Sequence, residues 1–370
     1  MYIVFTVLLF GSTKVAFDLN TTPITGIGLM CGTSHDALDI AGVEFEMNSG
    51  VWSYRLLASR TIPLRGNLLK DLDRSTSMSG LELATLDFQF ASFCAESVNV
   101  FIAEEDAKYD FIASHGVTIF HDPDNGINMQ IGSGAIISSL TRLTVVCDFR
   151  SQDVALSGQG APLVPLADAL LFSEFEYTLN LGGFANLAKN SASNVTGFDV
   201  SFCNLALNFV SRQLGKPFDM NGDIARSGQL ITSLFEALNN LDYYNESPPK
   251  SLGIEWMTKH LDPLLNDHSR SPKDLLFTLT EHIATQIGIV LPVHGRCLIT
   301  GGGAHNTYLI ERIKQLTRCD VSIPDGALID YKEAVDFAFL GVLRLQEKTN
   351  VLSSVTGAKS DTISGAVYIG

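Results

Sequence analysis

Hydrophobic side chains recur along this chain at two spacings, one typical of β-strands and one typical of helices. Segments 26–39, 40–46 and 52–64 are apolar, β-branched or aromatic runs bounded by Asn, Ser and Gly, so we expect three strands joined by short turns. Residues 80–108 carry apolar side chains at helical spacing and predict the first long helix. The elements expected next are a strand, a helix, a strand and a helix, at 111–114, 134–140, 143–149 and 165–172.

The same order of elements then begins again. Three strands are expected at 177–181, 185–189 and 195–200, and a helix follows at 205–214. The remaining elements are a helix, a strand and two helices, at 272–293, 297–300, 306–316 and 332–346. Two successive units of this kind predict a duplicated α/β fold. We expect an extension at 1–25 and domains at 26–172 and 173–370, with the last helix a candidate to pack back toward the first domain.

Length and charge restrict the function. A chain of 370 residues exceeds what one hydrophobic core usually organises, so two domains are expected. The net charge of −15 argues against nucleic acid or an anionic membrane as a partner. If such an acidic chain binds phosphate, it must do so through a few local groups that attract anions, such as backbone N–H groups, one or two arginines or a metal ion.

The cysteines and the N-terminus bear on the compartment. The six cysteines are scattered and form no C-x-x-C pair, which indicates free thiols in a reducing environment. Residues 1–10 are apolar, but no Lys or Arg precedes them and they are too short to span a bilayer. We therefore expect a cytoplasmic protein whose N-terminal extension is disordered or an edge strand, with a cleaved signal peptide as the alternative.

The most informative stretch is 148–165, which reads DFRSQDVALSGQGAPLVP. An apolar run leads to Asp148, Arg150 and Asp153, and a glycine-rich segment follows them. A buried strand that delivers polar groups to its carboxyl end, beside glycines, is how α/β proteins commonly build ligand sites. The alternative is a strand and an ordinary loop in which the arginine and a carboxylate form a structural ion pair.

Other polar positions have both a functional and a structural interpretation. Gly32-Thr33-Ser34 leaves amides and hydroxyls free for phosphate, and the nearby Asp36 and Asp39 can hold Mg²⁺ through water, but many such segments are only turns. The segment 301–306, GGGAHN, lies between a strand and a helix, where a ligand can approach the backbone, although it is not G-x-G-x-x-G.

Three further side chains carry the same ambiguity. His115 could line a pocket or be a satisfied core group. Asp219 is a plausible helix cap. Glu333 is expected to open the last helix, where the helix dipole favours a carboxylate even without a function.

In combination, the wording and order of these segments resemble one family, the 1,6-anhydro-N-acetylmuramic acid kinases, over about residues 26–370. The motifs that carry the resemblance are Gly28-Leu29-Met30, Gly32-Thr33-Ser34 with Asp36 and Asp39, Ala113-Ser114-His115-Gly116, Gln130-Ile131-Gly132, Asp148-Phe149-Arg150 with Asp153, Gly158-Gln159-Gly160-Ala161-Pro162-Leu163-Val164-Pro165, Leu181-Gly182-Gly183 with Ala185-Asn186, Pro248-Pro249-Lys250-Ser251, Gly301-Gly302-Gly303-Ala304-His305-Asn306, Glu333-Ala334 with Phe337-Ala338, and Thr356-Gly357-Ala358. The GQGAPLVP segment is the most specific of them.

The resemblance implies two duplicated actin-like (ribonuclease H-like) domains of the sugar-kinase ATPase superfamily with a cleft between them. It implies a kinase that opens a 1,6-anhydro bridge and phosphorylates the freed 6-oxygen, with ATP and Mg²⁺, as part of amino-sugar recycling from peptidoglycan. It also implies a homodimer, with no nucleic acid or membrane partner.

The resemblance also assigns roles to residues. Asp153 is expected to be the general base that takes the proton of the attacking water, with Asp148 as the reserve candidate. Expected substrate-binding residues are Asp148, Arg150, His115, Gln159 and Glu333. Expected nucleotide-binding residues are Gly32, Thr33, Ser34, His35, Asp36, Asp39, Gly182, Gly183, Gly301, Gly302, Gly303 and Asn306. Asp36 and Glu333 are the candidates for holding the metal or its waters.

The chain departs from the family pattern at several positions. Cys31, Ala37, Val117 and Ser157 stand where Ser, Gly, Gln and Gly are usual, and Asn208 stands where Asp is usual. The largest change is at 198–204, FDVSFCN, where the family resembles F-D-T-G-P-G-N. Bulkier, stiffer residues in that turn put affinity or turnover in doubt.

These departures keep other functions open. Val117 motivates a kinase for another anhydro-sugar such as levoglucosan. The altered turn motivates a relative that binds sugar or nucleotide without efficient turnover. An unrelated phosphohydrolase that shares the fold is a further alternative.

Overall fold

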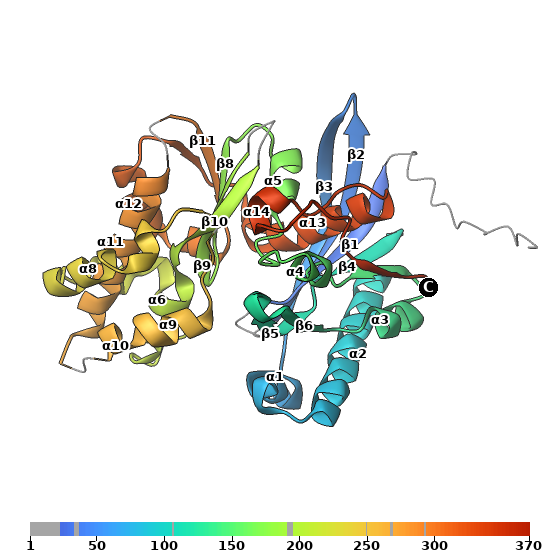
Figure 1. The fold of residues 1–370 in the computed structure, drawn as a ribbon, viewed down its shortest axis with the longest axis horizontal. Helices are drawn as coiled ribbons and strands as arrows, with labels where there is room; N and C mark the ends of the chain where they lie inside the picture. The colour runs from blue at the N-terminus through green and yellow to red at the C-terminus, as the bar shows by residue number, and fades with distance from the viewer. Residues whose placement is uncertain are drawn as a thin grey trace, which may run out of the picture.

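The structure, a computed structural model, describes residues 23–32, 37–105, 107–190, 195–248, 250–266, 269–291 and 294–370. Most of the predicted N-terminal extension and the predicted site residues Thr33, Ser34, His35 and Asp36 lie outside these ranges. Figure 1 shows two lobes side by side, one around the strands β8–β11 and one around β1–β4, with α5, α13 and α14 between them.

The first sheet has the strand order β13-β7-β4-β1-β2-β3. Strands β1, β2 and β3 form an antiparallel meander, β4 and β7 continue from β1 in parallel, and β13 pairs antiparallel with β7. The bounds of these strands are Ile24–Met30 (β1), Ala37–Asn48 (β2), Val51–Pro63 (β3), Phe111–Ser114 (β4), Thr144–Cys147 (β7) and Ala366–Tyr368 (β13). A separate hairpin consists of β5 (Val117–Asp122) and β6 (Ile127–Ile131).

The second sheet repeats this topology, with the order β10-β9-β8-β11-β12. Strands β8, β9 and β10 form an antiparallel meander, and β11 and β12 continue from β8 in parallel. Their bounds are Tyr177–Leu181 (β8), Phe184–Lys189 (β9), Thr196–Phe202 (β10), Arg296–Thr300 (β11) and Asp320–Ser322 (β12). The repeated arrangement of three antiparallel and two parallel strands confirms the predicted fold class, a duplicated actin-like (ribonuclease H-like) α/β fold.

Helices surround the two sheets. Those that follow strands of the first sheet are α1 (Gly66–Asp73), α2 (Gly80–Glu105), α3 (Gly134–Thr141), α4 (Ser151–Ala155) and α5 (Pro165–Leu171). Those of the second half are α6 (Asn204–Arg212), α7 (Asp223–Arg226), α8 (Thr232–Asn239), α9 (Ile254–His260), α10 (Asp262–Leu265), α11 (Pro272–Val290), α12 (Thr307–Leu316), α13 (Gly326–Leu345) and α14 (Ser353–Thr356). None of the helices in the described ranges is both long and apolar enough to span a bilayer.

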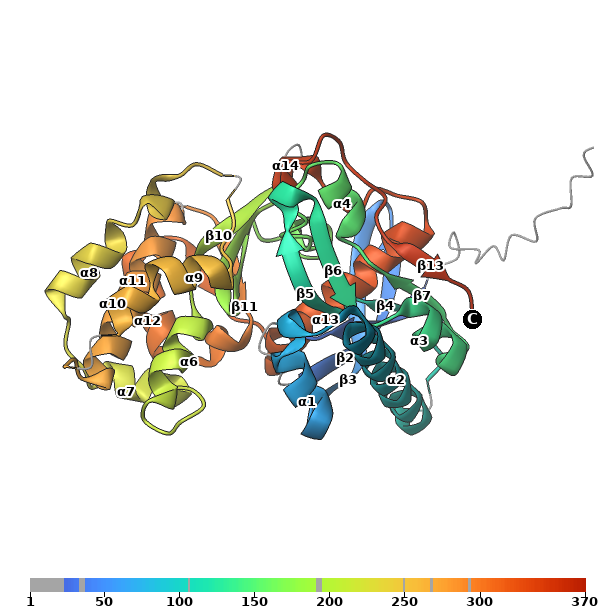
Figure 2. The same ribbon diagram turned by 60° about the horizontal axis from the view of Figure 1, so that its bottom comes forward.

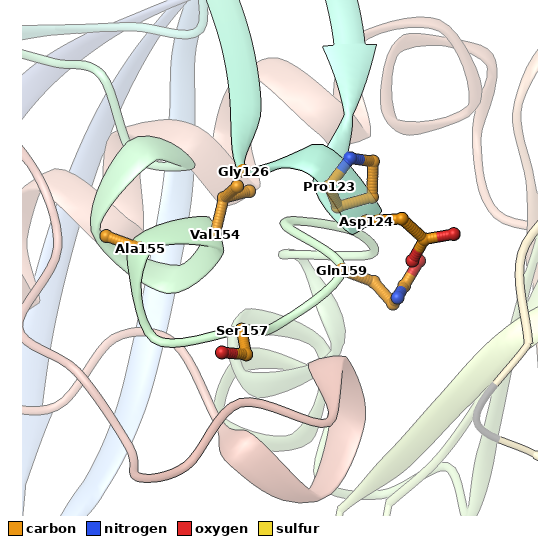
Figure 3. Close-up of a pocket in the computed structure, with 7 residues that line it drawn as sticks. All are labelled: Pro123, Asp124, Gly126, Val154, Ala155, Ser157 and Gln159. Carbon is orange, nitrogen blue, oxygen red and sulfur yellow. The ribbon is translucent and has the colours of Figure 1, made fainter.

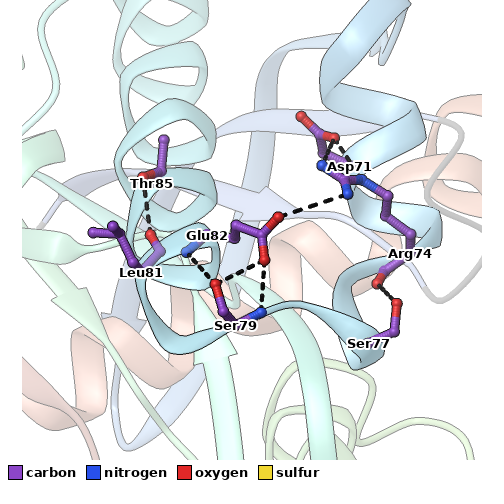
Figure 4. A network of polar contacts seen from close by, with 7 residues as sticks. All are labelled: Asp71, Arg74, Ser77, Ser79, Leu81, Glu82 and Thr85. Atoms are coloured by element: carbon purple, nitrogen blue, oxygen red, sulfur yellow. Dashed lines mark hydrogen bonds and ion pairs between the residues drawn. The ribbon is translucent and has the colours of Figure 1, made fainter.

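The longest helix, α2, begins at a reciprocal cap drawn in Figure 4. The backbone N–H and the hydroxyl of Ser79 both donate to Glu82 Oε2, at 2.8 and 2.7 Å, and the Glu82 N–H faces Ser79 Oγ at 3.4 Å. Ser at the N-cap and Glu three residues later satisfy N–H groups that the first helical turn leaves without partners. Arg74 lies 3.8 Å from the other oxygen of Glu82 and adds a weak, exposed ion pair.

Helix α13 carries the chain from the second half back onto the first sheet. Alternate residues of the central strands point to opposite faces: Phe111 and Ala113 pack with α13, whereas Ile112 packs with α2 on the other face. The Phe339 ring lies 5.4 Å from that of Phe45 and 5.1 Å from that of Trp52. Apolar helix residues on both sides therefore bury the first sheet.

The approach of α13 to β1 depends on Gly28. A Cβ atom added there would lie 1.8 Å from the backbone oxygen of Ala334, a clash that only movement of the helix can relieve. We expect Gly28→Ala to lower the free energy of unfolding by about 1–3 kcal/mol, as overpacking of a core usually does. Urea denaturation measures the change.

Gly80 provides the matched control for that substitution. A Cβ there meets nothing within 4 Å, and Gly80 begins α2. Gly80→Ala should be neutral or stabilise by up to about 1 kcal/mol, since alanine favours helix over glycine. Equal effects of the two substitutions would contradict the close packing of α13 on β1.

Several short elements do not follow from the hydrophobic pattern. These are α1, the β5–β6 hairpin, α4, α7–α10, β12, β13 and α14. The predicted start of the last helix is also wrong: α13 begins at Gly326, so Glu333 lies inside the helix and not at its N-terminus. Pro324-Asp325-Gly326 is typical of a turn, but here extended Asp325 is the N-cap residue of the helix. The dipole explanation for Glu333 therefore fails.

Candidate functional site

The predicted carboxylate stretch begins where β7 ends. The strand stops at Cys147, so the strand predicted to end at 149 is two residues too long, and Asp148 adopts a left-handed backbone with φ of 55°. Asp148 is exposed, and its Oδ1 accepts a hydrogen bond from the Ser151 N–H at 3.3 Å. Arg150 is the N-cap residue of α4, and Asp153 lies within that helix. The change of direction after β7 thus sends the two carboxylates into different environments.

Asp153 is fully buried, at 0% relative exposure, and both its oxygens are engaged. Oδ2 accepts the N–H of Gly160 at 2.8 Å, and Oδ1 accepts the hydroxyl of Thr356 at 2.7 Å. A Cβ at Gly158 would lie 2.2 Å from Oδ2, so the glycine lets the loop close over the carboxylate. Each oxygen of an ionised carboxylate has a second lone pair available for another donor.

Arg150 joins this loop to the end of β4. Its Nη1 donates to the backbone oxygen of Gly160 at 2.6 Å, and its Nη2 lies 2.8 Å from His115 Nε2. Because arginine can only donate, Nε2 is the acceptor, and the ring proton is on Nδ1, which is 3.0 Å from the Gly116 oxygen. His115 is buried and lines the site as a neutral acceptor.

The electrostatics agree with that tautomer. Burial, with the positive charge of Arg150, lowers the pKa of His115 to about 3. Burial lowers the pKa of Arg150 to about 10, while Glu333, Asp153 and Asp199 act to raise it. Arg150 is therefore charged and His115 neutral at pH 7, and one buried cation faces three carboxylates.

Glu333 connects this group to the second sheet. Asn180, near the end of β8, donates its Nδ2 hydrogen to Glu333 Oε1 at 2.9 Å. Burial raises the pKa of Glu333, Lys332 and Arg150 lower it, and Asp39 raises it further. Asp39 in turn accepts the hydroxyl of Thr61 at 2.6 Å. The structure therefore places Asp39 and Glu333 in one electrostatic environment.

The predicted glycine turns of the second half lie around the end of β8. Gly301 has φ of 81°, and a Cβ there would lie 2.3 Å from Asn180 Oδ1. The oxygens of Gly182 and Gly183 accept the N–H groups of Asn204 and Cys203 at 3.1 and 2.9 Å. Gly303 packs equally closely on Leu181, and Gly302 lies between these two tight contacts. Close backbone packing is thus one reason for glycine here, whether or not a ligand binds.

Two other predicted nucleotide-binding residues, Asn306 and Gly32, have surroundings unlike those of the glycine turns. Asn306 is the N-cap residue of α12, and its Oδ1 accepts the Leu309 N–H at 3.0 Å. Gly32 follows β1 and is half-buried, directly before the undescribed residues 33–36.

Asp219 satisfies N–H groups of the first turn of α7: its two oxygens accept the N–H groups of Ile224 and Ala225 at 2.9 and 2.8 Å. Within the described part of the chain no three His, Cys, Asp or Glu side chains are grouped to hold a metal ion.

The altered segment 198–204, predicted to be a turn, lies mostly in strand β10 and is well packed. Val200, Ser201, Phe202 and Cys203 are all buried, and none of these described residues has a positive φ. The Phe202 ring stacks on His282 with centroids 5.1 Å apart, and Ser201 Oγ lies 3.2 Å from the Tyr244 hydroxyl. The substituted residues therefore do not adopt the left-handed backbone that would require glycine.

Asp199, in the same segment of β10, is buried beside Arg150. It accepts hydrogen bonds from Asn186 Nδ2 and, at 2.7 Å, from the Leu252 N–H. Burial nevertheless raises its pKa to about 6. Sequence reasoning assigned no function to this carboxylate, although it faces the same cation as Asp153 and Glu333.

This shift makes stability depend on pH with a defined sign. In the unfolded chain an aspartate ionises near pH 3.9, and in the folded chain Asp199 ionises at about pH 6. Ionisation therefore costs stability as pH rises from about 4 to 6. We expect the free energy of unfolding of wild type minus that of Asp199→Asn to fall by about 2 kcal/mol between pH 4 and pH 7.

Urea denaturation at both pH values gives that difference. The exposed Asp242→Asn variant is the control and should follow wild type at each pH. A difference between wild type and Asp199→Asn that stays constant, or that grows with pH, would rule out a buried Asp199 with a raised pKa.

Two pockets lie next to this group of residues. A pocket of about 390 Å³, drawn in Figure 3, lies between the β5–β6 turn, α4 and the loop that contains Gln159. Its lining residues are Pro123, Asp124, Gly126, Val154, Ala155, Ser157 and Gln159. A second pocket of about 180 Å³ is lined by His115 and Asp148, with Asp87, Gln130 and Tyr368 among its other residues. Of the predicted substrate-binding residues, Gln159 lines the first pocket and His115 and Asp148 line the second, whereas Arg150 and Glu333 line neither of these two.

Comparison with known proteins identifies the relatives of this chain. A sequence model of the family described as "Anhydro-N-acetylmuramic acid kinase" matches residues 25–370. An anhydro-N-acetylmuramic acid kinase of Pseudomonas syringae pv. syringae (strain B728a) is 34% identical over 365 residues, covering 92% of this chain and 98% of the relative. The enzyme of that name from Xylella fastidiosa (strain Temecula1 / ATCC 700964) is 36% identical over 368 residues, covering 92% and 95%. The chain belongs to the anhydro-N-acetylmuramic acid kinase family.

The resemblance predicted from motifs is thereby confirmed, and the chain is a kinase. The family's kinase activity and the actin-like fold together imply use of ATP. Among solved structures, an activator of the 2-hydroxyisocaproyl-CoA dehydratase from Clostridium difficile with bound ADPNP has a TM-score of 0.43 at 12% identity, covering 88% of this chain and 96% of that one.

The site also contains three residues to which the family motifs gave no role. Thr356 holds Asp153, Asn180 holds Glu333, and Asp199 faces Arg150. Thr356 belongs to the Thr-Gly-Ala triplet already noted in the sequence, so a signal existed for it, but its partner is 203 positions away. Asn180 lies near the end of β8 and Asp199 in the middle of β10, and sequence alone does not distinguish packing from function at such positions.

Proposed function

We propose that this protein is an ATP-dependent kinase that hydrolytically opens the 1,6-anhydro ring of 1,6-anhydro-N-acetylmuramic acid and yields N-acetylmuramic acid 6-phosphate. The observation that carries the proposal is the family match across residues 25–370, which includes Asp153, Arg150, His115 and Glu333. Relatives over nearly the same length have that substrate in their names.

The proposed reaction joins hydrolysis to phosphoryl transfer. Water attacks the anomeric carbon, the bond from that carbon to the 6-oxygen breaks, and the 6-oxygen attacks the γ-phosphorus while ADP leaves. Asp153 accepts the proton of the water, because a positioned carboxylate is a suitable general base. The hydrogen bonds from Gly160 and Thr356 support this role, since they fix the carboxylate and each oxygen retains a lone pair.

Arg150 is proposed to position and stabilise negative charge in the site. It faces Asp153, Asp199 and Glu333, and its hydrogen bonds to Gly160 and His115 hold its guanidinium in one orientation. A fixed cation needs no reorganisation as charge develops, which is the main way that proteins assist phosphoryl transfer. Neutral His115 adds no second positive charge beside it.

Nucleotide and metal binding are proposed at the glycine turns and the carboxylates between the halves. The residues proposed for the nucleotide are Gly32–Asp36, Asp39, Gly182, Gly183 and Gly301–Gly303 with Asn306. The burial of Glu333 and the nearby charge of Asp39 fit a cation such as Mg²⁺, because a cation would offset the cost of two close carboxylates. Glu333 and Asp36 would hold the ion or its waters, and the ion when bound would neutralise phosphoryl charge.

The altered positions bear on the choice of substrate. Val117, which motivated levoglucosan as an alternative, is 1% exposed and packs in the core of the first sheet. It therefore gives no direct reason to prefer a smaller sugar. The good packing at 200–203 likewise weakens the case for a non-catalytic relative. We further propose that the domains divide near 172–173 and that the enzyme is a homodimer.

The assay that tests this function uses purified full-length protein with Mg-ATP. The two sugars, 1,6-anhydro-N-acetylmuramic acid and levoglucosan, are supplied separately, and ADP and sugar phosphate are both measured. Sugar phosphate in equal amount to ADP with the muramic acid substrate is the expected result. ADP release with neither sugar phosphate would contradict a kinase for anhydro-sugars, and turnover of levoglucosan alone would favour the alternative.

A further inference from the structure

The C-terminal loop, residues 351–362, lies against the proposed base. An isolated bridge between Val351 and Thr362 closes the loop, and α14 forms its turn. Figure 2 shows α14 between β10 of the second sheet and α4, the helix that contains Asp153. Two parts of the chain far apart in sequence therefore meet at this loop.

Thr356 is the closest point of contact. Its side chain is 1% exposed, and its hydroxyl donates to Asp153 Oδ1 at 2.7 Å. Its backbone oxygen accepts the Gln159 N–H at 2.8 Å, and the Lys359 N–H donates to the Leu156 oxygen at 3.0 Å. The C-terminal loop thus holds the carboxylate of Asp153. It also holds the backbone at Leu156 and Gln159, on either side of Gly158.

The same loop also reaches the second sheet. Ser354 Oγ donates to the backbone oxygen of Val195, just before β10, at 2.7 Å. Nearby, a Cβ at Gly197 of β10 would lie 2.9 Å from the Pro165 ring. The loop is consequently fixed on one side by the second sheet and on the other by the Asp153 helix.

We infer that Thr356 is a positioning residue for the reaction, which holds one oxygen of Asp153 so that the carboxylate keeps a single orientation toward the attacking water. The inference rests on the proposed role of Asp153 as base. Buried carboxylates rotate about a nearly two-fold torsion, and two donors on different oxygens remove that freedom. A donor to a carboxylate also favours its ionised form, as a base requires.

Thr356→Val tests this inference, because valine replaces the hydroxyl with a methyl group of similar size. We expect kcat to fall about 10- to 100-fold, the effect of losing one hydrogen bond to a charged group. KM for ATP and for the sugar should stay within about threefold of wild type. Thr356→Ser should restore kcat to within about threefold of wild type, because serine keeps the donor hydroxyl.

Thr362→Val is the matched control. It is the same chemical change in the same loop, at a residue that is 3% exposed and whose hydroxyl contacts Ser364 instead of Asp153. We expect its kcat within about twofold of wild type. An equal loss of kcat in both variants would show that the loop is merely structural and would overturn the inference.

Two further measurements keep the test decisive. If Thr356→Val does not fold, Thr356→Ala, which leaves space instead of a methyl group, should give the same loss of kcat. In the Asp153→Asn background, Thr356→Val should have no additional effect on kcat, because the base that Thr356 positions is already absent. Asp153→Asn with wild-type kcat would overturn both the base and this inference. An inactive Asp153→Asn together with wild-type kcat in Thr356→Val would overturn the inference alone.

Discussion

Asp153→Asn should turn over the anhydro-sugar about 10²- to 10⁴-fold more slowly than wild type, the range over which general bases usually contribute. Asparagine keeps the shape of the side chain but cannot accept the proton of the attacking water. Steady-state kinetics with 1,6-anhydro-N-acetylmuramic acid and Mg-ATP measure kcat, and KM for ATP should change little.

The folded state should tolerate this substitution. The amide oxygen can accept the Gly160 N–H, and the amide nitrogen can donate to Thr356 Oγ1, since a hydroxyl both donates and accepts. We therefore expect the free energy of unfolding to change by no more than about 1 kcal/mol. A loss of kcat without a loss of stability separates a role in the reaction from a role in folding.

Asp148→Asn is the matched control for the same chemistry. Asp148 is exposed and accepts a hydrogen bond from Ser151 at 3.3 Å. We expect its kcat to fall less than about tenfold, because a solvated carboxylate at the turn after β7 is not held toward a reacting water. A larger loss in Asp148→Asn than in Asp153→Asn would reverse the assignment of the base.

Lys332→Met should cause the largest loss of stability among the substitutions considered. The Lys332 side chain is buried, and its Nζ pairs with Asp168 and, at 2.8 Å, with Asp336. Thr178 of β8 donates its hydroxyl to Asp168 at 2.6 Å. This cluster therefore joins α5, β8 and α13, the elements through which the chain passes between the two sheets.

Removing the lysine leaves two buried carboxylates without their cation. Burial raises the pKa of Asp336, and Lys332 opposes that effect. Although burial acts to lower the pKa of Lys332, the two carboxylates raise it above its usual range, so wild type contains the charged form. Breaking a buried ion pair by removing one partner usually costs about 3–5 kcal/mol, and we expect that loss in Lys332→Met at pH 7.5.

The pH dependence of this loss has a defined sign. Without Lys332 the folded-state pKa of Asp336, already raised by burial, should rise further, so the penalty is present above the unfolded pKa near 3.9 and disappears below it. The difference between variant and wild type should therefore be smaller at pH 4.5 than at pH 7.5, as measured by urea denaturation. Lys314→Met, at an exposed lysine of α12, should change stability by less than about 0.5 kcal/mol. A loss below about 1 kcal/mol in Lys332→Met would contradict the buried cluster.

The order of elements in both halves was predictable from the sequence. Short apolar runs at 111–114 and 177–181 coincide with β4 and β8, and helical spacing at 80–108 and 306–316 is close to α2 and α12. These elements bury one or both faces in a core, so the side-chain pattern records their conformation directly. Repetition of the pattern was sufficient to predict a duplicated fold.

Short elements were not predictable in the same way. Helix α4 spans Ser151–Ala155 and β13 spans Ala366–Tyr368, too few residues to show a period. The helix at Gly326 follows a turn-like Pro-Asp-Gly, and its first turn shows no regular apolar spacing. Their conformation depends on contacts with distant parts of the chain, which outweigh local preference.

The stretch from Asp148 to Pro165 shows most clearly which features could be inferred from the sequence and which depend on tertiary contacts. Together with the other motifs it indicated the family, whose expected chemistry led to Asp153 over Asp148 as the predicted base, and the family is confirmed. That Asp153 is buried between Gly160 and Thr356, while Asp148 is exposed, was decided by tertiary structure. The physical reason is distance along the chain: hydrophobic periodicity is local, whereas the environment of a carboxylate depends on donors that folding brings to it. Thr356 and Glu333 reach the same site as Asp153 only because α13 and the C-terminal loop return from the second sheet to the first.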